Sequence, residues 1–196
     1  MLFRSLQHPF VMSMANDIVH NILQKIKILY LSPIKYARYV GVKIGNNTFI
    51  ADKHHWPSEA YLITIGNDCA ITEGVKLYTH GGGRMMRQKY PDFDSFGKIS
   101  IGNHVYIGAS SQIMPGVTIE DNVLIANSSV VTKSVPSGVV VGGNPARIIC
   151  SIDDYIKRNI KYNTHTKGLS KVEKRKVLEK LPDNAFIKKK EMIYES

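Results

Sequence analysis

The sequence predicts a mainly β protein in which short strands wind into a stack of coils, with helical segments before and after the stack. The first observation is a six-residue period of aliphatic residues, found at Ile101, Ile107, Ile113, Ile119, Ile125 and Val131. Earlier positions with the same spacing are Ile65, Ile71 and Leu77, and then Ile44 and Ile50. A period of six fits neither an α-helix nor a two-sided strand, so it indicates a repeat architecture.

The second observation is a small or β-branched residue four positions after most of these aliphatic residues. These residues are Cys69, Val75, Val105, Ser111, Val117, Val123 and Ser129. Short strands joined by tight turns explain both patterns, because one large side chain points inward from each strand and a small one fills the corner beside it. Three such strands close a triangular coil, and stacked coils bury one continuous aliphatic column.

The third observation is helical patterning on both sides of the repeat. Residues 11–30 carry aliphatic residues at helical spacing, namely Ile18, Ile22, Ile26 and Leu29. They predict an N-terminal helix beside the coil, and Pro33 suits the first turn of a short helix that follows. After the repeat, Ser151 begins one predicted helix, which we expect to cover the open end of the last coil. A charged stretch within 169–183 predicts another helix.

Charge supports the same division into three segments, with a net charge of +10 for the chain. Lys and Arg outnumber Asp and Glu by 5 to 1 in the N-terminal helical segment 1–40 and by 12 to 7 in the basic C-terminal helices and tail 151–196. The ratio is 9 to 8 in the hexapeptide-repeat domain 41–150. A solvated surface explains the basic flanks, and contact with an anionic membrane or a lipid-linked glycan is the alternative. No nucleic-acid-binding motif accompanies the charge, so we expect no nucleic acid partner.

The chain also has no sequence signal for a membrane span or for export. No apolar run approaches the roughly 20 residues that cross a bilayer, and the N-terminus lacks the pattern of a signal peptide. The two cysteines, Cys69 and Cys150, give no disulfide framework. We therefore expect a cytoplasmic protein, with a peripheral position at the inner membrane face as the alternative.

The repeat is interrupted just after His80 by an excursion of residues 81–97. His80 lies three residues after Leu77, in an outward phase of the coil. A side chain on a rigid edge stays positioned, and the excursion can reach over it to form a pocket. Histidine is a suitable general base because its unperturbed pKa of about 6.5 leaves it largely neutral in the cell. We interpret His80 as a catalytic base; a surface histidine at a turn is the alternative.

These segments resemble the hexapeptide-repeat acyltransferases. The resemblance rests on the repeat, on "YTHGGG" and on "IGASSQIMPGVTIEDNVLIANSSVVTKSVPSGVVVGGNPARII", and it covers roughly residues 40–150. It is strongest to small O-acetyltransferases of galactosides, maltose, xenobiotics and polysaccharides, and "KYARYVGVKIG" and "KYPDFDSFGKI" are similar to capsule and O-antigen enzymes. The resemblance implies a left-handed parallel β-helix, a homotrimer, acetyl-CoA sites between subunits, and His80 as the base.

The resemblance also places residues along acetyl-CoA. Ala109 and Asn127 match positions that line the pantetheine arm, where a small Ala109 lets the arm approach the backbone. Thr132, Lys133 and Arg147 match positions at the CoA phosphates, for which lysine and arginine are suitable partners. A solvated turn is the alternative for Lys133. Some relatives have a second basic residue near the position of Cys150, so part of that contact is either missing or supplied by the C-terminal helix.

A second interruption, between Ile50 and Ile65, contains candidate residues for the acceptor. Asp52, His55 and Trp56 lie where the corresponding segment of relatives contributes to the acceptor side, and an aromatic face can stack on a pyranose ring. The alternative is an irregular loop in which Trp56 is a packing anchor. The carboxylate that orients His80 is left open among three candidates, Glu73, Asp92 and Asp94.

The function expected from these features is transfer of an acetyl group from acetyl-CoA to a sugar hydroxyl, of a bacterial surface polysaccharide or its precursor. One alternative is sugar N-acyl transfer, which uses the same base. A zinc-dependent, carbonic-anhydrase-like enzyme would need three convergent ligands, but only His80 and His104 lie in an outward phase of the coil, so we expect no metal. A non-catalytic β-helix would not need the long excursion.

Overall fold

The computed structural model describes residue 23, residues 30–53 and residues 56–191. The helix expected over residues 11–30 therefore lies outside the described residues except at two positions, and His55 lies outside them as well. Within the described ranges, no helix is long and apolar enough to cross a membrane.

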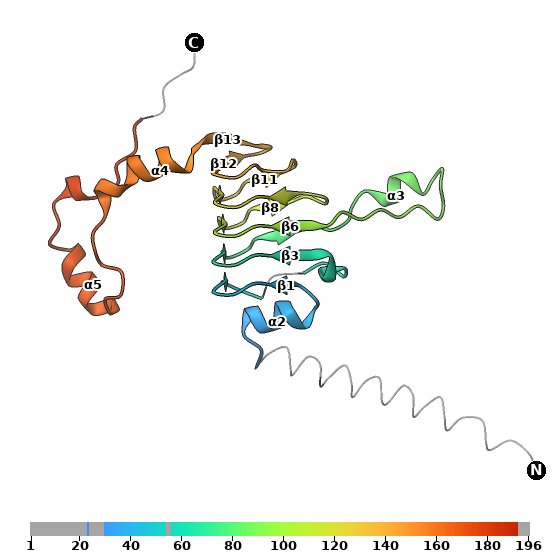
Figure 1. Cartoon of the computed structure of the whole chain (residues 1–196), viewed down its shortest axis with the longest axis horizontal. Helices are drawn as coiled ribbons and strands as arrows, with labels where there is room; N and C mark the ends of the chain where they lie inside the picture. Colours follow the sequence, from blue (N-terminus) through green and yellow to red (C-terminus); the bar gives the residue numbers. More distant parts are fainter. Residues whose placement is uncertain (1–22, 24–29, 54–55, 192–196) are drawn as a thin grey trace, which may run out of the picture.

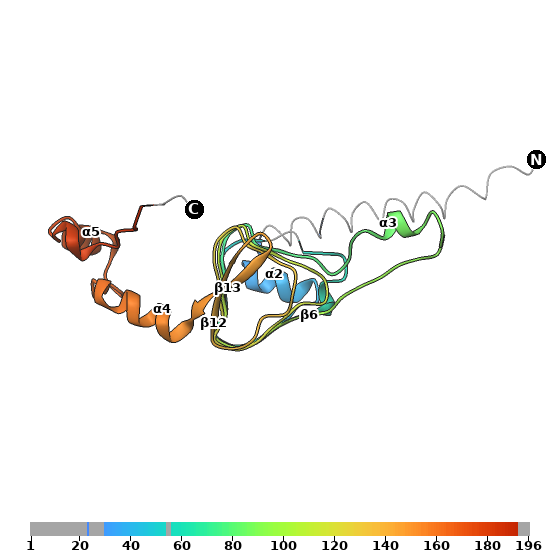
Figure 2. The ribbon, with the colours of Figure 1, turned by 90° about the horizontal axis from the view of Figure 1, so that it is seen from above.

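The centre of the molecule is a stack of coils in which the chain passes in turn through three sheets, and the strands are parallel except for the last strand of one sheet (Figure 1). Sheet A contains β1 (Lys43–Ile44), β3 (Ile63–Ile65), β6 (Ile99–Ile101) and β9 (Thr118–Ile119). Sheet B contains β2 (Phe49–Ile50), β4 (Ala70–Ile71), β7 (Tyr106–Ile107), β10 (Leu124–Ile125), β12 (Val139–Gly143) and β13 (Ala146–Ser151). Sheet C contains β5 (Lys76–Leu77), β8 (Gln112–Ile113) and β11 (Val130–Val131). Figure 2 looks along the stack, and the successive coils follow one closed outline.

Strand pairing shows how many residues each coil uses. In the upper coils residue 106 pairs with residue 124, and residue 112 with residue 130, so one coil takes 18 residues. Across the excursion residue 76 pairs with residue 112, a separation of 36. The coil that carries the excursion thus uses 18 residues more than the coils above it, and because 18 is a multiple of six, the six-residue period resumes in phase after the excursion. In the first coil residue 50 pairs with residue 71, a separation of 21.

The predicted inward column is confirmed by burial. From Ile50 to Val131 every aliphatic residue of the six-residue period is at most 5% exposed, and the small corner residues are buried as well. Ile44, in the first coil, is only partly buried. Burial of one isoleucine side chain stabilises a fold by roughly 1.5–3 kcal/mol. The serine hydroxyls in this core are also satisfied, because Ser111 and Ser129 both donate to the carbonyl of Ala126.

The corner between sheets A and B carries a ladder of polar side chains. Asn103 accepts a hydrogen bond from the backbone N–H of Asn67 at 2.9 Å, and Asp121 accepts one from the N–H of Asn103 at 2.6 Å. Each rung therefore caps the backbone of the coil next to it. Gly102 is required in this turn, because a Cβ there would collide with the Asp121 side chain of the next coil.

A short helix packs at the N-terminal end of the stack, as Figure 1 shows. This helix, α2 (Pro33–Tyr39), begins with the proline at its first turn as predicted, and its Ala37 is fully buried. A 3-10 turn, η1 (Ala60–Leu62), follows in the first interruption. The excursion contains α3 (Gly83–Met86) and projects away from the stack.

The chain ends in two α-helices, as predicted. Helix α4 (Ile152–Asn159) is capped by the Ser151 hydroxyl, which accepts from the N–H of Asp154 at 3.0 Å. Helix α5 (Lys171–Leu178) begins with a capping box formed by Ser170 and Glu173. Two 3-10 turns, η2 (Ile160–Tyr162) and η3 (Asp183–Ala185), follow these helices.

The expectation that the first of these helices covers the last coil is wrong. Strand β13 runs antiparallel to β12 as the last strand of sheet B, and α4 starts where β13 ends. The helix therefore leaves from the edge of sheet B and extends away from the coil, on the side opposite the excursion (Figures 1 and 2).

Candidate active site

His80 lies at the point where the chain leaves sheet C and enters the excursion. The entry and the exit of the excursion are joined there, because His80 forms an antiparallel bridge with Phe96 and the N–H of Gly97 donates to the carbonyl of Thr79 at 2.7 Å. Thr79 is completely buried. The coil thus holds the backbone of His80 rigidly, whereas the imidazole side chain is 47% exposed.

The side chain of His80 contacts a carboxylate and an aromatic ring. Its Nε2 lies 3.3 Å from Oε2 of Glu59, and its ring meets the ring of Phe96 edge-on, with centroids 5.7 Å apart. The Thr79 hydroxyl donates to the same Glu59 oxygen at 3.2 Å. A hydrogen bond from the Ser58 side chain, assisted by Thr79 and by the charge of His80, lowers the pKa of Glu59 below its ordinary value. Glu59 is therefore an ionised partner for the imidazole at neutral pH.

Glu59 is not among the three carboxylates, Glu73, Asp92 and Asp94, that were candidates from the sequence. The first coil takes 21 residues instead of 18, so the residue directly below His80 is the one 21 positions earlier. That residue is Glu59, in the interruption between β2 and β3. Knowledge of the length of the first coil would have identified it, but the sequence does not show how many residues the interruption adds.

A pocket of about 330 Å³ opens beside His80. It is lined by Ser58, Glu59, His80, residues 81–83, Arg84, Arg87, Asp94, Ser95 and Phe96. Arg87 is engaged within the excursion, because it lies 3.3 Å from Asp94 and donates to the carbonyl of Phe93. Within the described part of the chain, Arg84 forms no hydrogen bond or ion pair. The pocket therefore contains two arginines and two carboxylates, and among the described residues Arg84 is the arginine that forms no ion pair.

The two predicted acceptor residues that the structure describes, Asp52 and Trp56, do not line this pocket. Asp52 accepts a hydrogen bond from the N–H of Gly74 at 2.9 Å, which places it at the corner between sheets B and C. Trp56 is partly buried and packs against the hydrophobic core. Asp52 thus lies at the start of this face of the coil, and Glu59 of the same segment lies at its end, beneath His80.

The residues predicted to contact acetyl-CoA fall into two groups. Ala109 and Asn127 stack on adjacent coils, where the Asn127 side chain accepts from the N–H of Ala109 at 3.1 Å. Lys133 and Arg147 line one cavity of about 400 Å³ near the last coil. Thr132 is exposed on the turn beside Lys133. The structure therefore brings each group together but places the two groups at different points on the coil.

A metal centre needs several converging ligands, and the structure describes residue 23 and residues 30–53 and 56–191. In these ranges no group of three or more His, Cys, Asp or Glu side chains converges in a way that could hold a metal ion. His104, the other histidine in an outward phase of the coil, has its Nε2 4.0 Å from Asp68.

Comparison with known proteins identifies the family. The family model of bacterial transferase hexapeptides, with six repeats, matches residues 98–133. Protein CapG of Staphylococcus aureus is 46% identical over 153 residues, which is 76% of this chain and 89% of that relative. Galactoside O-acetyltransferase of Escherichia coli is 37% identical over 123 residues, 62% of this chain and 60% of that enzyme.

Among solved structures, a hexapeptide-repeat acetyltransferase of Vibrio cholerae, complexed with acetyl coenzyme A, is 33% identical to this chain with a TM-score of 0.50. The match covers 57% of this chain and 60% of that one, so the chain spans only about three fifths of this structure and of the galactoside enzyme. These findings show that the chain belongs to the hexapeptide-repeat acetyltransferases. It is an acyltransferase, as the resemblance implied.

Proposed function

We propose that this protein transfers an acetyl group from acetyl-CoA to a hydroxyl of a sugar that belongs to a bacterial surface polysaccharide or its precursor. The fold proposed for it is a left-handed parallel β-helix. The observation that carries the proposal is the contact between His80 and ionised Glu59 at the edge of a pocket. The similarity to CapG and to a galactoside O-acetyltransferase supports the choice of a sugar acceptor.

In this proposal His80 acts as the general base. Glu59 faces Nε2, which favours the tautomer with the proton on Nε2 and leaves the lone pair of Nδ1 to accept a proton. Nδ1 takes the proton of the acceptor hydroxyl while its oxygen attacks the thioester carbonyl, and Glu59 stabilises the imidazolium that forms. When the tetrahedral intermediate collapses, the C–S bond breaks and the imidazolium returns the proton to the CoA sulfur. An amine acceptor would use the same base, so sugar N-acetylation is the second candidate.

Acetyl-CoA is proposed to bind between copies of the chain in a homotrimer. Ala109 and Asn127 lie at the corner that leads into sheet C, whereas His80 lies where the chain leaves that sheet. A neighbouring copy that presents this corner to His80 would bring the thioester to the base. Ala109 and Asn127 would line the pantetheine arm, and Lys133 and Arg147, with Thr132 beside them, would hold phosphates.

The pocket beside His80 is proposed to bind the acceptor. Its volume of about 330 Å³ is at the lower end of the range of small-molecule sites. Among the described residues Arg84 forms no ion pair, whereas Arg87 is paired with Asp94. We therefore favour an acceptor that carries a carboxylate or a phosphate near the reacting hydroxyl. Asp52 and Trp56 lie outside this pocket and become weaker candidates for acceptor binding.

The experiment follows the release of the CoA thiol from acetyl-CoA in the presence of a panel of sugars and glycan fragments. Replacement of His80 by alanine is expected to lower acceptor-dependent release by ~10²–10⁴-fold, the usual contribution of a general base. His104→Ala is a matched control, since His104 is an exposed histidine on another turn of the coil. Release that survives His80→Ala would contradict the assignment of the base, and failure to bind acetyl-CoA would contradict the proposed reaction.

Peripheral binding to an anionic membrane or to a lipid-linked glycan is a further part of the proposal, because 12 lysines and arginines lie in residues 151–196. Each basic residue near an anionic surface contributes about 1 kcal/mol. Co-sedimentation with vesicles should therefore increase with the content of anionic lipid. Vesicle binding that does not depend on the lipid charge would contradict the proposed binding to an anionic membrane.

A further inference from the structure

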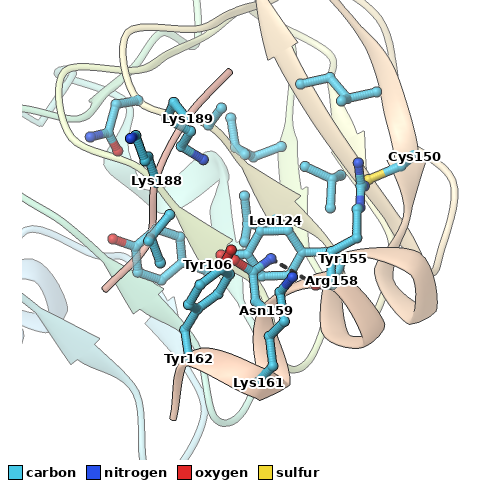
Figure 3. A pocket seen from close by; sticks show the side chains of 16 residues that line it. Tyr106, Leu124, Cys150, Tyr155, Arg158, Asn159, Lys161, Tyr162, Lys188 and Lys189 are labelled. Atoms are coloured by element: carbon cyan, nitrogen blue, oxygen red, sulfur yellow. Dashed lines mark hydrogen bonds between the residues drawn. The ribbon is translucent and has the colours of Figure 1, made fainter. Parts of the chain in front are cut away.

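Helix α4 and its C-cap residue Ile160 present two different faces. Tyr155, Arg158 and Tyr162 line a cavity of about 950 Å³ between this helix and the outer face of sheet B, where Figure 3 shows their side chains. Ile156 and Ile160 do not line the cavity, and they are 52% and 62% exposed. Because residues four apart lie on the same side of a helix, the two isoleucines form an apolar stripe that faces away from the cavity.

Positive charge lies at the free end of the same helix. The acidic residues of α4, Asp153 and Asp154, occupy its first turn, which follows directly after β13, whereas Lys157 and Arg158 occupy its last turn. Asp154 is engaged in the helix cap, because the Ser151 hydroxyl donates to its carboxylate at 2.7 Å. The end of α4 that points away from the coil is therefore the basic end (Figure 1).

Helix α5 repeats this combination of an exposed aliphatic residue with cations. Val172 is 64% exposed, and Lys176 lies one turn later on the same side of the helix. Both helices lie away from the coil, on the side opposite the excursion (Figures 1 and 2). The excursion therefore does not stand between these helices and an extended surface on their side of the molecule.

Exposed aliphatic side chains next to cations are suited to a surface that is both apolar and anionic. A bilayer with anionic lipids has both properties, since its headgroups attract lysine and arginine and its acyl region accepts aliphatic side chains. A second copy of the coil is a less complementary partner. Its basic and acidic residues are nearly balanced, at 9 to 8 in residues 41–150, whereas the ratio is 12 to 7 in residues 151–196. Charge therefore favours the lipid surface over a second copy.

We propose that Ile156 and Ile160 insert into the interface of an anionic membrane, while Lys157 and the other cations of the C-terminal segment contact the lipid headgroups. This inference rests on the proposed peripheral membrane binding and names the residues that carry it. It adds a component that net charge alone does not supply. Salt screens the attraction between cations and headgroups, but it does not screen the burial of aliphatic side chains.

The test measures co-sedimentation of the full chain with vesicles of phosphatidylcholine, with and without phosphatidylglycerol. The variant Ile156→Ser/Ile160→Ser removes both aliphatic side chains and keeps every charge. The matched control, Phe49→Ser/Tyr61→Ser, removes two side chains of similar exposure, 59% and 61%, from outside the C-terminal segment. Burial of one isoleucine is favourable enough that we expect the first variant to bind anionic vesicles about tenfold or more weakly. We expect the control to bind as the wild type does.

Tryptophan fluorescence measures the insertion directly. Brominated lipids in the anionic vesicles should quench the tryptophan of Ile160→Trp. They should leave the emission of the wild type unchanged, since its single tryptophan, Trp56, packs against the hydrophobic core.

The outcomes separate this inference from the proposals on which it rests. A wild type that does not bind anionic vesicles would overturn both the inference and the proposed membrane binding. Wild-type binding that the isoleucine substitutions leave unchanged would overturn the inference alone. If these substitutions abolish self-association, measured by light scattering, and leave vesicle binding unchanged, the stripe is an interface between copies and the inference is wrong. Because vesicle binding needs no acetyl transfer, it fails independently of the assay for thiol release.

Discussion

The coils of residues 99–131 and the excursion of residues 81–97 are built on opposite principles. In the coils each aliphatic residue of the period is at most 2% exposed and each strand pairs with the coils around it. In the excursion Met85 is 74% exposed and Tyr90 is 48% exposed, and the loop is joined to the coil at its two ends. Stability therefore comes from the periodic region, whereas the proposed catalytic residues, His80 and Glu59, lie where the period is broken.

The largest expected effect is a loss of stability in the coil. Ile119 is fully buried, and Ile119→Ala should lower the free energy of unfolding by about 2–5 kcal/mol, through lost burial and the cavity left behind. The matched control, Met85→Ala, removes an exposed side chain from the excursion and should change it by less than about 0.5 kcal/mol. Urea unfolding at one fixed protein concentration measures both. Similar losses in the two variants would contradict the comparison.

The next effect concerns the carboxylate beneath His80. Glu59→Gln keeps the shape of the side chain but removes the charge that orients and stabilises the imidazolium, so kcat should fall roughly tenfold to a hundredfold, the loss of one hydrogen bond to a charged group. Glu73→Gln is the control, since Glu73 was an open candidate and contributes only its backbone carbonyl to the neighbouring coil. An unchanged kcat in Glu59→Gln would contradict the positioning role of Glu59.

A smaller effect is expected from replacing Arg84, which forms no ion pair with another described residue. If the acceptor carries an anion, Arg84→Gln should raise its KM about tenfold, the loss of one charge-assisted hydrogen bond. The KM of a carboxyl-reduced form of the same sugar should not change. Lys89→Gln is the control, because Lys89 is in the same loop, lies over the ring of Tyr90 and does not line the pocket. Equal changes with the charged and the neutral sugar would rule out recognition of the anion.

The smallest effect is on the pH dependence of stability. The pKa of Glu59 is lowered in the folded protein, first by the Ser58 hydrogen bond, so the carboxylate is bound more favourably in its ionised form. Its stabilising contribution is therefore present above the ordinary pKa of a glutamate, about 4.3, and is lost as the pH falls through the lower folded value. The stability difference between wild type and Glu59→Gln should vanish in acid. A stability difference that grows on acidification would contradict a stabilising contribution from the ionised Glu59 carboxylate.

The regular parts of the molecule were predictable from sequence because each coil repeats one local rule. Inward residues such as Ile107 follow from the period, and the helix starts at Pro33 and Ser151 follow from the conformational and capping preferences of those residues. The pairing of Glu59 with His80 could not be predicted. It depends on the length of an irregular coil, which no repeat specifies. For the same reason the direction of α4, set by the pairing of β13, was predicted wrongly.

One experiment tests most directly whether the coil supplies stability while the excursion completes the site. It removes the excursion and leaves the coil intact. Deletion of residues 81–98 takes out 18 residues, the length of one coil, so Leu77 and Ile101 become neighbours in the six-residue period while His80 and Glu59 are kept. We expect a folded protein with the same cooperative unfolding and with acceptor-dependent thiol release reduced by at least ~10²-fold, because the pocket has lost most of its wall. A shortened protein that transfers acetyl groups as fast as the wild type, or one that cannot fold, would contradict the separation of scaffold and site.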